Sequence, residues 1–192
     1  MLIQSLVEFE DLGPVVLRNS FNGETFTFPP TSNDRDVAAF SCSLEPEGSG
    51  GGNAMLHIHP HARETFRVRT GCLLVHIDGA DRLIFAGDSI TIEAGEKHRF
   101  YNHSIGPTKF DVEFSPAQRH RDFFMTFGQL TERKPQWFSH KGKPDFLLMA
   151  LMLHEFRDHL YLAAVPTKAQ KLLFALATPL ALMCGYRLPR SR

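Results

Sequence analysis

Between residues 25 and 115, apolar and polar residues alternate in short runs that are separated by turn-forming residues. This period of two is typical of antiparallel strands in a sandwich or a barrel, because successive side chains of a strand point to opposite faces. Near the end of this region, three apolar residues alternate with Lys109, Asp111 and Glu113, which predicts a strand with one face in a core and one in water. The pattern predicts strands at 36–44, 54–59, 64–69, 72–78, 82–85, 89–92, 98–102 and 109–114.

After residue 116 the pattern changes to helix formers with apolar residues three and four positions apart. This spacing predicts three helices, at 121–130, 146–159 and 168–185, separated by prolines. We therefore predict a mainly β fold with two parts. Residues 1–116 form an antiparallel barrel that includes N-terminal strands, and residues 117–192 form a helical extension that packs on the barrel or on a partner.

The segment 172–186 is almost wholly apolar, but it contains Pro179 and is shorter than the roughly 20 residues that span a bilayer. We expect no transmembrane span. Three arginines follow this segment, so peripheral contact with a membrane surface is an alternative to packing on the barrel or on a second subunit. A glycine-rich stretch at 45–53 predicts a loop at the rim of the barrel, which is either a linker or a lid.

The charge balance and the cysteines restrict the function. Lys plus Arg and Asp plus Glu are 21 each, so no net charge favours nucleic acid, and we expect none as a partner. Three distant cysteines without a CxxC pair argue against a disulfide framework. The N-terminus has early acidic residues and no sustained apolar core, so we expect no secretory signal and a cytoplasmic protein.

The candidate chemistry lies in a group of histidines and a glutamate. His57 and His59 are separated by one residue on a predicted strand, so both side chains project from the same face. Glu64 opens the next strand after a turn, and a closed barrel would bring His98 to the same point. Any one of these histidines alone is better interpreted as a surface residue, but together they predict a site for one divalent transition metal ion, which is Fe, Mn, Ni, Cu, Co or Zn.

Two spaced motifs carry a resemblance to the cupin superfamily. The first comprises Gly51, His57, His59, Glu64 and Gly71, and the second comprises Gly87, Gly95, His98 and Asn102. One position departs from the family pattern, since Glu93 stands where the family usually has proline. The resemblance implies a jelly-roll barrel in which His57, His59, Glu64 and His98 bind the metal. It also implies a single cupin domain, and a homodimer because cupins often pair.

The surroundings of the predicted metal site are apolar. Phenylalanine supplies 17 of the 21 aromatic residues, and side-chain alternation places five apolar residues on inward-facing positions: Met55, Phe66, Val68, Phe100 and Phe114. Such a pocket suits a hydrophobic molecule whose hydroxyl, enol, ketone or carboxylate reaches the ion. The residues His61, His76 and His103 are interpreted as solvent-facing, although His61, His76 and Tyr101 are weak candidates for acid–base work.

We therefore expect a metal-dependent enzyme that acts on a hydrophobic small molecule. The resemblance allows several reactions, because cupins include dioxygenases, isomerases, decarboxylases and cyclases as well as proteins without catalysis. Glu64 would double as a proton acceptor if it detaches from the ion. The alternative is a metal-stabilised binding protein that holds a ligand without converting it.

Overall fold

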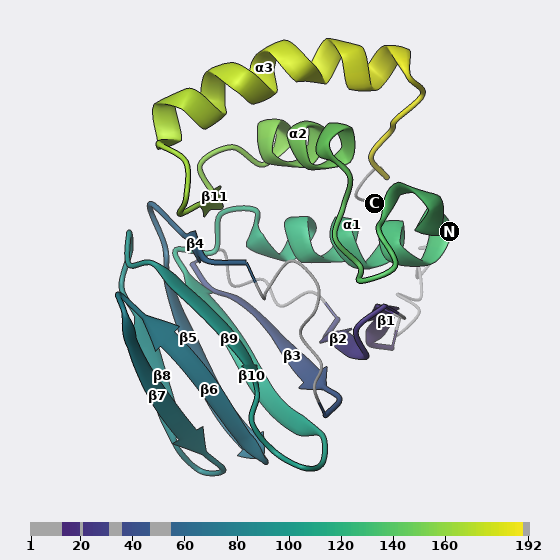
Figure 1. Ribbon diagram of the computed structural model, residues 1–192. Coiled ribbons are helices and arrows are strands. Elements are labelled where there is room, and N and C mark those ends of the chain that lie inside the picture. Colours follow the sequence, from purple (N-terminus) through teal and green to yellow (C-terminus); the bar gives the residue numbers. More distant parts are fainter. Residues whose placement is uncertain (1–12, 20, 31–35, 47–54, 190–192) are drawn as a thin grey trace, which may run out of the picture.

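The computed structural model describes residues 13–19, 21–30, 36–46 and 55–189, and the chain forms two antiparallel sheets that are covered on one side by helices (Figure 1). The first sheet has the strand order β1-β2-β3-β10-β5-β8, and the second has the order β11-β4-β9-β6-β7. This arrangement confirms the predicted mainly β, jelly-roll architecture with helices that follow it.

The strands of the first sheet are β1 (Val15–Asn19), β2 (Glu24–Phe28), β3 (Ala38–Leu44), β10 (Thr108–Ser115), β5 (Arg63–Thr70) and β8 (Ser89–Ile92). Those of the second are β11 (Tyr161–Leu162), β4 (His57–Ile58), β9 (His98–Asn102), β6 (Cys72–Ile77) and β7 (Ala80–Phe85). Each of the eight strands predicted from residue 36 onward overlaps one of these strands. The segment β11 was not predicted, because two residues are too few to show a period.

The alternation read from the sequence creates the core of the barrel. On β10, Phe110, Val112 and Phe114 are buried, whereas the residues between them are half-buried or exposed. The rings of Phe66 and Phe100 meet edge to face with centroids 4.7 Å apart, and Phe110 contacts both. These residues fill the space between the sheets, and such aromatic pairs add about 0.5–1.5 kcal/mol each beyond the burial of their area.

The three predicted helices are present as α1 (His120–Arg133), α2 (Phe146–Glu155) and α3 (Thr167–Met183), and a short 3-10 helix, η2 (Pro135–Trp137), follows α1. Helix α1 packs against β1, β2 and β3, and α2 packs against α3. Figure 1 shows α1 nearest the sheets and α3 farthest from them. Helix α2 ends four residues earlier than predicted, because the chain turns at Asp158, whose φ is 72°.

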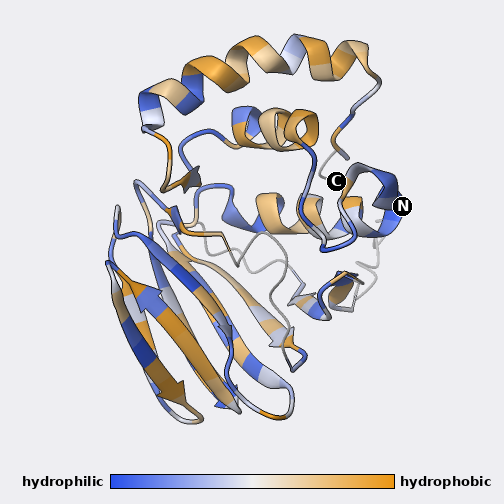
Figure 2. Ribbon diagram, in the orientation of Figure 1, coloured by the Kyte–Doolittle hydropathy of each residue, from blue (hydrophilic) through white to orange (hydrophobic). Residues whose placement is uncertain are grey.

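Helix α3 buries only one narrow side. Its buried residues are Gln170, Phe174, Ala177 and Ala181, whereas five leucines along the helix are exposed, and Figure 2 shows this outer helix as largely hydrophobic. No helix among the described residues is long and apolar enough to cross a bilayer. Most of the predicted rim loop at 45–53 lies outside the described residues, so the choice between a linker and a lid is not tested.

Candidate metal centre

The four predicted ligands come together between the two sheets. His57 and His98 are register partners on β4 and β9 of the second sheet, and His59 follows one residue after β4. Glu64 lies on β5 of the first sheet and reaches the same point from the opposite side. One ligand atom from each residue lies within 4.8 Å of all the others, and no residue of the four is more than 2% exposed.

A backbone carbonyl orients each imidazole. The Nδ1 atoms of His57, His59 and His98 lie 2.8, 2.5 and 3.1 Å from the carbonyl oxygens of Met55, His159 and Glu96. Because a carbonyl only accepts, Nδ1 carries the proton in all three rings, and Nε2 is the atom that can present a lone pair. Metal-binding histidines are held in this way, with the outer nitrogen donating to a fixed acceptor.

The histidine Nε2 atoms and the Glu64 carboxylate are better arranged to bind a cation than to hydrogen-bond to one another. The Nε2 atom of His98 lies 2.8 Å from Oε2 of Glu64, and that of His59 lies 3.6 Å from the same oxygen. Among the described residues, Nε2 of His59 has no hydrogen-bond partner although it is buried, and such an orphan costs about 1–3 kcal/mol. A metal ion held by three imidazole nitrogens and a carboxylate would satisfy this atom, so the donor set fits a divalent transition metal.

The charges of the histidines follow from their surroundings. Burial, and then the neighbouring His98, lower the pKa of His57 to about 3. Burial also lowers the pKa of His59 well below its usual value, with the nearby histidines adding to the effect. Both rings are therefore neutral at pH 7, as metal ligation requires. Burial opposes the charged form of His98 as well, but the hydrogen bond to Glu64, the charge of Glu64 and the contacts with Glu96 together outweigh burial and raise the pKa of His98.

Two further histidines lie beside the centre and were not singled out from the sequence. The ring of His120, which is 1% exposed, lies 5.1 Å from that of His59 and stacks on Phe114 at 4.1 Å. Its Nδ1 donates to the Ala117 carbonyl, whereas its Nε2 has no partner among the described residues. The ring of His159 lies 5.1 Å from that of His120. Neither belongs to a spaced motif, so sequence reasoning had no signal for them.

The predicted pocket residues occupy two different places. Met55 lines an apolar cavity between the barrel and the helices. By contrast, Phe66, Val68 and Phe100 are buried in the core of the barrel, and Phe114 is buried with its ring centroid 4.9 Å from that of His59. Their role around a substrate stays a prediction.

The weaker candidates lie outside the cluster of four ligands. His61 and His103 are exposed, as the sequence interpretation expected. His76 is half-buried on β6, and its Nδ1 lies 2.6 Å from Oδ1 of Asp81. Tyr101 is also half-buried. None of these residues is among the ligand atoms that gather at the centre.

Comparison with known families agrees with this geometry. Residues 41–114 match the family described as Cupin domain, and this segment includes all four ligands. This match confirms the resemblance to cupins seen in the two motifs.

Curated relatives match a short segment only. The chain is 37% identical over 68 residues to the protein named "Probable oxidoreductase patJ" of Aspergillus clavatus, and the match covers 35% of this chain and 21% of that protein. The protein of the same name from Penicillium expansum is 34% identical over a segment of the same length. The match thus spans about a fifth of the length of these relatives.

Solved structures resemble the chain more broadly but at low identity. A predicted oxalate decarboxylase from Thermotoga maritima is 20% identical, with a TM-score of 0.46, over 60% of this chain and 99% of that one. Pac13, a nucleoside dehydratase from Streptomyces, is 16% identical, with a TM-score of 0.45, over 57% of this chain and 81% of that one.

Proposed function

We propose that the protein is a metal-dependent enzyme that acts on a hydrophobic small organic molecule such as an enol, a phenol, a ketone, or a polyketide-like or terpenoid-like metabolite. The observation that carries this proposal is the gathering of four buried ligand atoms within 4.8 Å. Three of them belong to imidazoles whose outer nitrogens are already held by backbone carbonyls. A site prepared in this way has little to reorganise when an ion binds.

His57, His59, Glu64 and His98 would hold one divalent ion of Fe, Mn, Ni, Cu, Co or Zn. Such an ion supplies Lewis-acid polarisation of a substrate oxygen and, where it is redox-active, a route for electrons to dioxygen. Four protein ligands leave coordination positions open on an ion that takes five or six. The protein contributes the enclosure, because all four side chains are almost fully buried, and electrostatic effects are stronger where water is excluded.

Glu64 is the catalytic residue in this proposal. Its Oε2 lies 2.8 Å from Nε2 of His98 and 3.6 Å from Nε2 of His59, so this oxygen lies beside the imidazole nitrogens that would hold the ion. If the three imidazoles held the ion, a Glu64 carboxylate free of it would accept a proton at Oε2 from an acidic C–H or O–H of the substrate.

The proposed substrate class follows from the apolar side chains beside the metal ligands. Phe114 packs against His59, and Met55, whose carbonyl orients His57, turns its side chain into an apolar cavity. Of the five predicted pocket residues, Met55 and Phe114 are the ones beside the centre, and their thioether and aromatic groups favour hydrocarbon over sugar or phosphate.

Two branches of reaction are compatible with these residues, namely dioxygenation and a metal-assisted isomerisation, cyclisation or decarboxylation. The identity of 37% over 68 residues to a protein named as an oxidoreductase supports the first branch. A non-catalytic metal-stabilised binding protein is the second candidate. It is favoured by the shortage of other acid–base groups, since the further buried polar group beside the centre, His120, has its pKa lowered by burial to about 4.

We extend the proposal to a homodimer in the cytoplasm. The thiols of Cys42, Cys72 and Cys184 are free, which suits a reducing compartment. Exposed leucines along α3, among them Leu176 at 70% exposure, support contact with a second copy, because such apolar patches tend to be covered. Size-exclusion chromatography with light scattering measures the mass directly, and a monomer at micromolar concentration would remove this part of the proposal.

Oxygen uptake tests the catalytic branch. The purified protein, loaded with one metal at a time, is given a panel of apolar enols and phenols in an oxygen electrode, with product analysis by mass spectrometry. Uptake that depends on both metal and substrate, and that is lost in Glu64→Gln at equal metal content, supports dioxygenation. Conversion without uptake supports the second branch. Saturable binding of panel compounds without conversion by any metal form would support the non-catalytic binding protein instead.

A further inference from the structure

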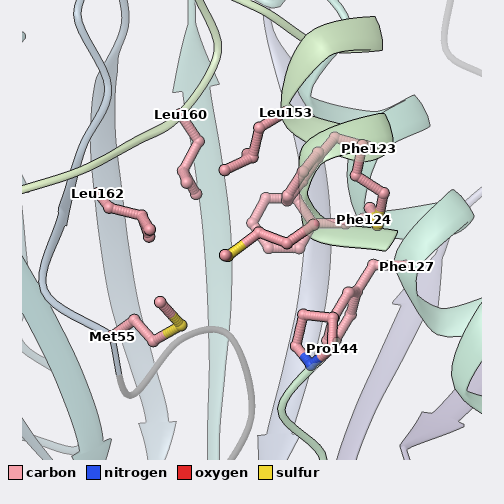
Figure 3. A pocket seen from close by; sticks show the side chains of 10 residues that line it. Met55, Phe123, Phe124, Phe127, Pro144, Leu153, Leu160 and Leu162 are labelled. Carbon is pink, nitrogen blue, oxygen red and sulfur yellow. The ribbon is translucent and has the colours of Figure 1, made fainter. Parts of the chain in front are cut away.

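An apolar cavity lies where the helical extension meets the barrel (Figure 3). Its volume is about 50 Å³, and Met55 contributes its barrel side. The remaining walls come from α1, α2 and the segments next to them: Phe123, Phe124, Phe127, Pro144, Met149, Met152, Leu153, Leu160 and Leu162. All ten lining side chains are apolar, so the cavity offers no side-chain hydrogen bond to a ligand.

The cavity shares residues with the supports of the metal centre. Met55 turns its side chain into the cavity while its carbonyl oxygen accepts from Nδ1 of His57 at 2.8 Å. Leu160 lines the cavity directly after His159, whose carbonyl accepts from Nδ1 of His59 at 2.5 Å. The same short stretches of backbone therefore border the cavity and orient two of the four ligands.

A second connection runs through stacked rings. Phe124 lines the cavity and packs on Phe114 with centroids 5.7 Å apart. Phe114 in turn contacts the ring of His59 at 4.9 Å. Protein interiors are close-packed, so a group that enters the cavity displaces side chains that contact the metal ligands. The cavity is thus placed to sense or to position a molecule at the metal centre.

We propose that this cavity is a binding site for a small alkyl group, because its volume of about 50 Å³ is well below the roughly 150 Å³ of a protein cavity that binds benzene. Under the proposed function, on which this last step rests, that group is the apolar part of the substrate. Its walls are phenylalanine rings, which offer flat apolar surfaces, and three methionines, whose flexible thioethers adapt to irregular shapes. Binding there takes hydrocarbon out of water, worth about 25 cal/mol per Å² of apolar surface buried.

The helical extension would then determine which substrates the barrel accepts. Helix α1 supplies Phe123, Phe124 and Phe127, and α2 supplies Met149, Met152 and Leu153. The ligands, by contrast, all come from the segment 41–114 that matches the cupin family. Reaction chemistry and substrate selection are therefore assigned to different parts of the chain.

The methionines provide a direct test with dissolved xenon, a probe that enters small apolar cavities. In the full-length protein labelled with ¹³C at the methionine methyl groups, the xenon pressure is raised stepwise and the methyl resonances are followed by NMR. Met55, Met149 and Met152 line the cavity, whereas Met125 and Met183 do not. The expected result is a saturable shift of the first three with little change at the other two. Shifts of equal size at all five, or none that saturates, would overturn the proposal.

A pair of matched variants sharpens the test. Leu162→Trp fills the cavity from β11, and Leu83→Trp makes the same change on β7, where Leu83 is 45% exposed. Leu162→Trp should weaken xenon binding at least tenfold, and Leu83→Trp should leave it unchanged. Equal binding in both variants contradicts the proposal. If Leu162→Trp does not fold, the titration of the unsubstituted protein still decides.

Experiments can distinguish failure of the cavity proposal from failure of the proposed function. In His98→Ala, xenon binding should persist, because none of the residues that line the cavity is a metal ligand. Xenon binding together with no conversion of any panel compound would sustain the cavity and remove its link to a substrate. Conversion of an apolar substrate with an unchanged KM in a folded Leu162→Trp would remove the cavity from the account and leave the enzyme.

Discussion

Nδ1 of His59 lies 2.5 Å from the carbonyl oxygen of His159, although the two residues are one hundred positions apart in the chain. The strand β11 follows at once and pairs with β4, so that Tyr161 faces Ile58 and Leu162 faces His57. A segment of the helical extension therefore completes the sheet that carries His57 and His98. The same segment supplies the carbonyl that accepts from His59. The metal centre depends on parts of the chain beyond the family motif.

The turn that presents this carbonyl predicts a positioning effect for Tyr161. Its hydroxyl accepts from the Asp158 amide at 3.1 Å and donates to Oδ1 of Asp158 at 3.0 Å. Tyr161→Phe should lower stability by about 1–2 kcal/mol, because two hydrogen bonds are lost. It should also weaken metal affinity up to about tenfold without changing the stoichiometry, as losses in the support of a ligand do. Competition with a chromogenic chelator measures the affinity.

Tyr101→Phe is the matched control, since Tyr101 is half-buried on β9 and its hydroxyl has no part in orienting a ligand. An equal loss of affinity in the two variants would show that the Asp158 turn does not support the centre.

The four ligands should differ in how much each contributes to metal affinity. His57→Ala and His98→Ala each remove an Nε2 donor from the cluster and should abolish stoichiometric binding. Glu64→Gln keeps an amide oxygen in place of a carboxylate oxygen, so it should weaken binding less than either histidine variant. His61→Ala is the control, because His61 is exposed and outside the cluster. Full occupancy in a folded His98→Ala would exclude His98 from the ligand set.

The metal-free protein should lose stability as the pH falls below about 6.5. Burial lowers the pKa of His57 to about 3 and that of His120 to about 4, so the unfolded chain binds protons first. The loss begins near the unfolded pKa of 6.5 and is complete for His120 near pH 4, at a cost on the order of 3 kcal/mol. Unfolding in urea across this range measures it, and His120→Phe should remove part of the slope. Constant stability between pH 6.5 and 4 would contradict the burial of neutral histidines.

Metal binding should release a proton from the pair formed by His98 and Glu64. The hydrogen bond and the charge of Glu64, together with Glu96, outweigh burial and raise the pKa of His98, and Nδ1 of His98 already faces the Glu96 carbonyl. The proton on Nε2 must leave before this nitrogen can bind an ion. Titration of Zn²⁺ at pH 6.5 in two buffers of different ionisation enthalpy measures the protons released. Glu64→Gln should release fewer, and an equal release in both proteins would contradict the pairing.

The strands and the shared face of His57 and His59 were predictable because they depend on local rules, whereas the place of His98 was expected from barrel closure and from the family resemblance. His57 and His59 share a face because successive side chains of a strand point to opposite sides. The same alternation along β10 identified its inward-facing phenylalanines from the sequence alone. The supports were not predictable, since the acceptor for His59 is a backbone carbonyl, an atom that every residue has. His120 gave no signal for a related reason, because its place beside His59 results from how α1 packs on the first sheet.

The central claim is that His57, His59, Glu64 and His98 bind one ion, and elemental analysis of untagged protein by plasma mass spectrometry tests it most directly. We predict one transition metal ion per chain, lost in His57→Ala and His98→Ala while circular dichroism shows the fold intact. Protein that contains no metal as purified, and that takes up none after reconstitution with each of the six candidate ions, would contradict the account.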